Sequence, residues 1–170
     1  MACSNATLKG LVNDCSTSIG GIKRIFIADR TADVKFTVEE DLVTAISGGT
    51  FHQYYVRQNS SSFTSTATID PSNGVQFIET KLNLVFTRID NIKRIEINAL
   101  LVSETYVLVE DANGIVHLLG YENPVTATNS GAESGTQRTD GNKYSLELTD
   151  VTSGYPLQVK AEVLSTLTVG

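Results

Sequence analysis

The sequence predicts a mainly β fold, a β-sandwich or barrel of antiparallel strands with one flanking α-helix at about residues 90–102. Charged residues make up only 19% of the chain, while Ser, Thr, Asn and Gly are plentiful, a composition typical of sheet-and-loop proteins. Apolar and polar residues alternate in most ordered segments, and one segment has helical spacing instead. With 170 residues and 41% hydrophobic content, the chain can bury one sizeable core.

Residues 1–20 are predicted to form an N-terminal arm. They combine glycine, asparagine and serine with few apolar residues, so they lack the periodicity of a strand or a helix. The ordered fold is expected to begin at Gly21 and to continue as a single β domain over residues 21–170.

The first strands are predicted at residues 22–27 and 34–38, where β-branched and aromatic residues alternate with polar ones. Residues 39–47 open with three acidic residues, which would suit a helix start, but their later β-branched residues suit a strand equally well. A strand is the preferred interpretation.

Two further strand-like segments, at residues 50–57 and 63–69, flank a polar loop, and a hairpin is their simplest arrangement. The turn at residues 71–74 follows, because proline presets its first corner and Asn-Gly tolerates positive φ. It leads into a long alternating run at 75–87. A strand of roughly 13 residues would span about 43 Å, so it is expected to bend or to extend beyond a small sheet.

The helix prediction rests on a change of period after Asp90, which is a good N-cap. The apolar stripe consists of Ile92, Ile95, Ala99 and Val102, with Ile97, Leu100 and Leu101 beside it. The residues expected to pack the helix against the sheet are Ile92, Ile95, Leu100 and Leu101.

The second half of the chain contains the clearest hairpin of the sequence. Its strands are predicted at residues 106–110 and 115–120, because Asn113-Gly114 supplies the positive φ angles that a tight turn needs. A flexible loop rich in Thr, Ser, Gly and Asn is expected at residues 122–142. Two closing strands are predicted at residues 144–148 and 157–163.

The charge and the apolar pattern of the chain argue against nucleic-acid binding, membrane insertion and secretion. A net charge of −6 argues against tight nucleic-acid binding, which needs a basic surface to neutralise phosphates. No stretch approaches the ~18 apolar residues that cross a bilayer, so no membrane partner is expected. The first residues lack the basic start and apolar run of a secretory signal, which predicts a cytoplasmic place of synthesis and assembly.

The sequence offers little for catalysis. A zinc site would need His52 and His117 to converge from distant strands, since Cys3 and Cys15 do not form a C-x2-C pair. Neither a G-x-S-x-G elbow nor a glycine-rich phosphate loop before a helix is present. We therefore expect no metal, no cofactor and no enzymatic activity.

A series of turn and packing motifs carries a family resemblance. The motifs are Ser-Asn-Gly-Val-Gln-Phe at 72–77, the amphipathic segment 90–101, the Asn-Gly hairpin at 109–120, the segment 139–148, and the opening motif Cys15-x4-Gly20-Gly21-Ile22-Lys23. Together, over most of residues 15–150, they resemble structural proteins of tailed bacteriophages that infect Bacteroidetes, including crAss-like phages.

The resemblance implies a virion protein of the tail or neck, assembled in the host cytoplasm. Its expected fold is tail-tube-like, a β-sandwich or barrel with one helix, repeated around a channel through which DNA is ejected. The implied partners are six or twelve copies of the chain, other phage tail or neck proteins, and genomic DNA that passes without specific binding. A stacked tube and a single adaptor ring remain alternatives.

A ring would give the acidic balance a role. Six copies, with a net charge of −6 each, together carry −36. This negative charge repels the phosphates of passing DNA. Glu39, Glu40 and Asp41 are candidates for the lumen, and they suit the outer solvated surface equally well.

The alternative function is a capsid decoration protein or a host-surface binding module on the same β scaffold. Such a module would expose aromatic residues in a groove, for example Tyr54, Tyr55 and Tyr121. A hydrolase that uses carboxylates is a more remote third option.

Overall fold

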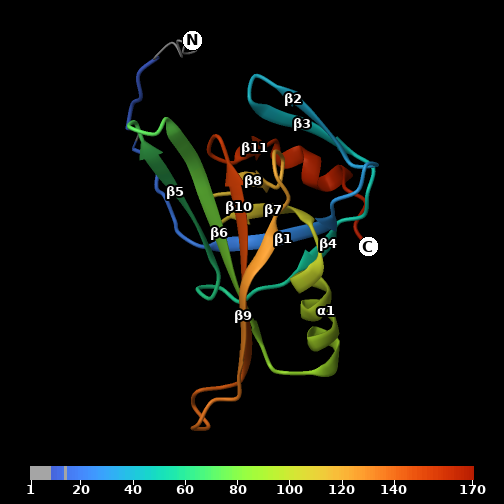
Figure 1. Ribbon diagram of the computed structural model, residues 1–170. Helices are drawn as coiled ribbons and strands as arrows, with labels where there is room; N and C mark the ends of the chain where they lie inside the picture. The colour runs from blue at the N-terminus through green and yellow to red at the C-terminus, as the bar shows by residue number, and fades with distance from the viewer. Residues whose placement is uncertain (1–8, 14) are drawn as a thin grey trace.

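The computed structural model describes residues 9–13 and 15–170, and it confirms the prediction of a mainly β fold (Figure 1). The described residues form two sheets. The larger sheet has the order β2 (Lys35–Glu39), β3 (Leu42–Ser47), β11 (Leu157–Val159), β8 (Val116–Leu119), β7 (Thr105–Asp111), β1 (Ile22–Asp29) and β4 (His52–Tyr54). The smaller sheet has the order β5 (Ser62–Asp70), β6 (Val75–Thr87), β10 (Lys143–Thr152) and β9 (Thr126–Glu133).

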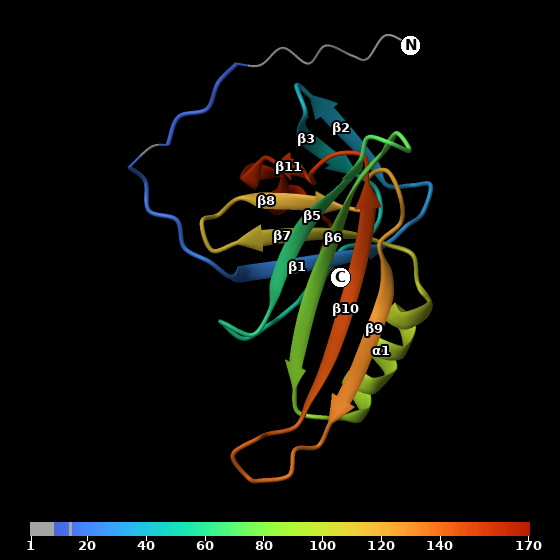
Figure 2. The same ribbon diagram turned by 60° about the vertical axis from the view of Figure 1, so that its left-hand side comes forward.

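The two sheets face each other across one apolar core, as in a β-sandwich. Alternate residues of β1 and β7, among them Ile25 and Val107, meet Leu82 of β6 and Leu146 of β10 in this layer. The strands of the smaller sheet cross in front of those of the larger one (Figure 2). Period-two alternation in β6 and β10 therefore leaves the opposite face of the smaller sheet to polar side chains.

The larger sheet is apolar on its other face too. Phe26, Leu108 and Leu118 point away from the sandwich and pack beneath the 3-10 helix η1 (Ala161–Thr166), which contributes Val163. Because β1, β7 and β8 are buried on both faces, their sequences are nearly continuous apolar runs instead of clean alternations.

The long strand predicted at residues 75–87 is confirmed as β6, which pairs antiparallel with β5 on one side and β10 on the other. The turn at Asn73-Gly74 joins β5 to β6, with Gly74 at φ 64°. The hairpin expected between residues 50–57 and 63–69 is wrong, because β4 pairs with β1. The strong turn at 71–74 gives β5 a nearer partner in β6.

The segment expected to be a flexible loop, residues 122–142, contains a strand. β9 pairs antiparallel with β10, and Val125 just before it is fully buried and exchanges backbone hydrogen bonds with Thr105. The Thr- and Asn-rich composition hides this strand, because an outer strand with polar side chains still gains its ladder of backbone hydrogen bonds.

Helix α1 (Asn91–Val102) begins where the sequence predicts. The carboxylate of Asp90 accepts a hydrogen bond of 2.8 Å from the backbone N–H of Lys93, the arrangement of an N-cap. The helix packs beside β9. Leu100 is buried in the core between the sheets, as expected.

The other predicted packing residues of α1 require a correction. Ile92, Ile95 and Leu101 are exposed, and Ile97 is the second buried residue of the helix. The helix carries apolar side chains on two faces, and the narrower of the two packs against the protein's own core. The broad stripe read from the sequence faces outward.

Residues 9–13 and 15–20, the described part of the predicted arm, contain no helix or strand. Residues 1–8 and 14 lie outside the described part of the chain. The arm is attached where Asn113 of the β7–β8 turn exchanges hydrogen bonds of 2.8 and 3.0 Å with the backbone N–H and carbonyl of Ile19. Beyond this point the arm leaves the start of β1 and runs clear of both sheets (Figure 2).

Candidate functional site

A cleft of about 720 Å³ opens between the β2–β3 turn, the end of β8 and the end of β10. Its acidic lining residues are Glu40, Asp41, Glu122 and Asp150. Of the described residues that line it, none is Lys, Arg or His. The cleft is therefore a concave surface with a negative potential.

The β2–β3 turn brings two of the predicted acidic residues to this cleft. Glu40 and Asp41 both have positive φ, 51° and 62°, which is the geometry of a two-residue turn that matches the twist of a hairpin. Glu39 pairs with Leu42 at the end of β2 and lines a neighbouring hollow with Lys160. The structure thus places Glu40 and Asp41, but not Glu39, in the cleft.

Asp150, from the end of β10, is the most buried acidic residue of the cleft, with 1% of its surface exposed. Its Oδ2 accepts a hydrogen bond of 3.1 Å from the backbone N–H of Gly120, whereas no group in the described residues donates to its buried Oδ1. Burial raises the pKa of Asp150, and the nearby charge of Glu122 raises it further, against the lowering effects of the Gly120 hydrogen bond and Arg30. An unsatisfied carboxylate oxygen in this position is costly.

The chain reaches Asp150 through a turn that requires glycine. Gly120 follows β8 with φ 94°, and a Cβ there would lie 2.8 Å from the carbonyl oxygen of Thr105. The absence of a side chain lets the backbone approach β7 closely and directs the Gly120 N–H at the carboxylate.

Glu122 is held at the edge of the cleft by the loop after β10. Its carboxylate accepts hydrogen bonds from the backbone N–H and the hydroxyl of Ser153, at 2.9 and 2.7 Å. These bonds lower the pKa of Glu122, so it is negatively charged at neutral pH. Arg30 does not line the cleft and donates at 3.2 Å to the backbone carbonyl of Glu122, leaving that carboxylate to the cleft.

Aromatic and apolar groups complete the cleft. Tyr121 lies edge-on to Phe36, with ring centroids 6.0 Å apart, and Tyr155 is exposed beside Pro156 and Leu157. Such a mixture suits a ligand with a cationic head and an apolar portion, since carboxylates attract the first and the rings cover the second.

The aromatic residues proposed from the sequence do not gather in one groove. Tyr54 packs near Phe86 in the core and donates a hydrogen bond to Glu96 of α1, while Tyr55 next to it is exposed. Tyr121 is the one of the three that lines the cleft.

The histidines and cysteines are not brought together. His117 lies 3.5 Å from Asp111 and against the ring of Phe63, whereas His52 is exposed on β4. Cys15 is exposed, and Cys3 lies outside the described residues. Within residues 9–13 and 15–170, no group of three or more His, Cys, Asp or Glu side chains is arranged to hold a metal ion.

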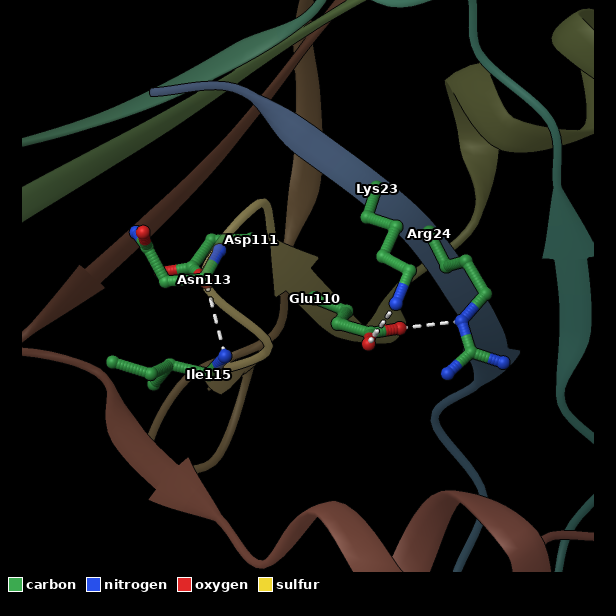
Figure 3. A network of polar contacts seen from close by, with 6 residues as sticks. All are labelled: Lys23, Arg24, Glu110, Asp111, Asn113 and Ile115. Carbon is green, nitrogen blue, oxygen red and sulfur yellow. Dashed lines mark hydrogen bonds and ion pairs between the residues drawn. The ribbon is translucent and has the colours of Figure 1, made fainter. Parts of the chain in front are cut away.

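A second buried carboxylate, that of Glu110, is fully paired (Figure 3). Arg24 donates to one of its oxygens and Lys23 lies 3.4 Å from the other. Burial alone would raise the pKa of Glu110, but these two cations lower it overall. The neighbouring Asp111 caps the hairpin turn through the N–H groups of Asn113 and Ile115. Glu110 therefore stabilises the β1–β7 pair and offers no free acceptor.

Sequence reasoning did not identify Asp150 or Glu122. Asp150 follows Leu146 and Leu148 at the same alternate positions of β10, which face the core. A charged residue at an inward position of an otherwise apolar alternation is the signal that could have found it.

No helix of the described residues is both long and apolar enough to cross a bilayer. No protein-family model matches the sequence, and the curated proteins contain no significant match to it.

Proposed function

We propose that this chain is a structural subunit that assembles with copies of itself, and that the assembly is a ring or tail tube of a phage virion. The outward apolar face of α1 carries the proposal. Ile92, Ile95 and Val102 are 82%, 55% and 86% exposed, and Ala99 between them is exposed too. A monomer would leave this stripe in water.

The spacing of these residues favours a protein partner. Positions 92, 95, 99 and 102 follow the 3-4-3 interval with which apolar side chains form a helix-packing seam. Because Ile97 and Leu100 already fix the opposite face of α1 to the core, the seam cannot turn inward. It is available to another molecule.

The smaller sheet supports a second copy as that partner. β5 and β9 are its outermost strands in the described part of the chain, so each presents one row of backbone groups without a ladder partner in this sheet. α1 lies beside β9, which places the apolar seam next to one of these edges. Joining β9 of one copy to β5 of the next would cover both edges in a head-to-tail contact, the type of contact that forms a ring when the rotation between neighbours closes.

The polar face of the smaller sheet suits a channel for DNA. Lys81 on this face lies 3.9 Å from carboxylate oxygens of both Glu79 and Glu147, and Lys143 lies 3.4 Å from Glu133. Lysines that are paired with carboxylates offer little adhesion to phosphates. The placement of Glu39, Glu40 and Asp41 in a lumen stays a prediction, and the position of the last two in the cleft favours a subunit contact.

The proposal assigns the chain no catalytic role and no cofactor. Its partners are six or twelve copies, neighbouring tail or neck proteins, and DNA in transit. The resemblance of the motifs at 72–77, 90–101 and 109–120 to phage structural proteins supports a location in the virion and assembly in the host cytoplasm.

The test compares the size and shape of the particles formed by the unchanged chain and by a variant with a charged residue in the seam. Negative-stain electron microscopy should show rings or tubes for the unchanged chain, and Ile95→Glu should abolish them. Arg94→Glu is the matched control, because it places the same side chain on the same helix outside the seam. Equal assembly of both variants would contradict the role of this face.

The cleft supports a second candidate function, a capsid decoration or host-surface binding module. The observation in its favour is the exposed ring of Tyr155, which lines the same concave surface as Tyr121. A soluble monomer or trimer that binds a host-surface ligand, with loss of binding in Tyr155→Ala, would favour this function over the ring.

A further inference from the structure

We propose that the acidic cleft holds the N-terminal arm of a second copy, with Lys9 against the carboxylates and Leu11 and Val12 against the apolar wall. This inference rests on the proposed self-assembly and names the segment that joins two subunits. Three observations carry it: the unpaired oxygen of Asp150, the charge of the cleft, and the exposure of the arm.

The cleft needs a hydrogen-bond donor with positive charge. Asp150 Oδ1 is buried and accepts no hydrogen bond from the described residues, while Oδ2 is held by Gly120. Glu122 and the turn residues Glu40 and Asp41 add negative charge around it. An ammonium group satisfies both requirements, since it has three donors and one charge.

The arm supplies matching groups. Lys9 is the only basic residue in the first 20 positions of the sequence. Leu11 and Val12, which follow it, are 103% and 93% exposed, so their own subunit leaves them in water. A lysine has a long apolar stem that can lie against the aromatic lining residues, Tyr121 and Tyr155, while its ammonium faces the carboxylates of the cleft.

The attachment of the arm favours another copy over its own. Hydrogen bonds between Ile19 and Asn113 fix its base at the β7–β8 turn. Figure 2 shows the described arm leaving this point away from both sheets. An exchanged arm links neighbours without a new fold, because it docks an extended segment into a cleft that already exists.

The test uses full-length chains, one batch with natural isotopes and one labelled with ¹⁵N, mixed before assembly and treated with a carbodiimide. This reagent joins an ammonium to a carboxylate that lies in contact with it. The expected product is a peptide of Lys9 joined to Glu40, Asp41 or Glu122, with one light and one heavy partner. A set of joined peptides in which every species is purely light or purely heavy, with no mixed species, would show an arm docked on its own chain and overturn the inference.

A pair of variants tests the energetic role. Lys9→Gln should raise the dissociation constant of each subunit contact about tenfold, which corresponds to a loss of roughly 1.4 kcal/mol per contact. Lys35→Gln, on exposed β2, should leave this dissociation constant unchanged. Rings that form as readily in Lys9→Gln as in the unchanged chain would overturn the arm exchange while sustaining the proposed function. A chain that stays monomeric under all conditions would overturn both.

Discussion

The backbone N–H of Gly120 donates a 3.1 Å hydrogen bond to Oδ2 of Asp150, which joins the end of β8 to the end of β10 at the base of the acidic cleft. The other oxygen of the same carboxylate has no donor among the described residues. The free subunit therefore carries a buried acid that is only half satisfied. We interpret this as a cost to the stability of the single subunit, which a contact in the proposed assembly would remove.

Asp150→Asn should stabilise the free subunit at pH 7 by about 1 kcal/mol, because it removes a buried negative charge whose hydrogen bonds are incomplete. The folded pKa of Asp150 is raised, so its ionisation penalises the folded state above the ordinary carboxyl pKa, and the penalty disappears as the pH falls below it. Thermal unfolding of a non-assembling Ile95→Glu background at pH 7 and pH 3.5 measures the effect. The gain should vanish at the lower pH.

Asp33→Asn on the exposed β1–β2 connection is the control, with no expected change at either pH. A lower melting temperature of Asp150→Asn at pH 7 would contradict the interpretation of Asp150 as a destabilised acid.

Glu110→Gln should destabilise the protein by about 1–2 kcal/mol at neutral pH, the range for hydrogen bonds to charged groups, discounted because both cations are partly exposed. The pKa of Glu110 is lowered in the folded state, so its stabilisation is present above the ordinary carboxyl pKa and is lost as the pH falls through the folded value. Urea unfolding against pH measures this. Glu133→Gln, which loses an exposed pair with Lys143, should change stability by less than about 0.5 kcal/mol.

Gly120→Ala should destabilise the subunit by about 2 kcal/mol or more, because positive φ and a backbone oxygen within 2.8 Å act together. Gly74→Ala offers a clean comparison, since its φ is also positive but no atom lies within 4 Å of an added Cβ. Its cost should be near 1 kcal/mol. Similar costs for the two variants would show that the close approach to Thr105 is unimportant.

Tyr54→Phe should loosen α1 without unfolding the sandwich. Burial, followed by the hydrogen bond to Glu96, raises the pKa of Tyr54, so the hydroxyl keeps its proton and donates to the helix. Loss of this bond should cost about 1 kcal/mol and should speed amide exchange in residues 91–102 more than in β6. Tyr55→Phe, at the exposed neighbouring position, should leave exchange in α1 unchanged.

Period-two alternation predicted the parts of the fold whose faces differ in polarity. β6 was located from its sequence because Leu82 and Leu84 face the core between polar neighbours, and Asn113-Gly114 marked the β7–β8 turn. β9 was missed because its side chains are Thr, Asn, Ser and Gly, and its stabilisation comes from backbone pairing with β10. Amino-acid composition indicates which side chains are buried, so it does not reveal an outer strand whose side chains are polar.

The helix shows a different limit. Asp90 fixed its start, but the strongest stripe, which includes Ile92 and Ile95, faces outward. A hydrophobic stripe predicts that a face is covered and does not say whether its own chain or a neighbour covers it. Of the cleft, the sequence revealed the acidic turn at Glu40 and Asp41. Asp150 joins them only through the pairing of distant strands.

Analytical ultracentrifugation of the full chain over a wide concentration range tests the central claim of self-assembly most directly. The account predicts one closed species of six or twelve subunits that dissociates cooperatively on dilution, with no further growth unless rings stack into tubes. A single monomeric species at every concentration, with the Ile92–Val102 face of α1 left in water, would contradict it.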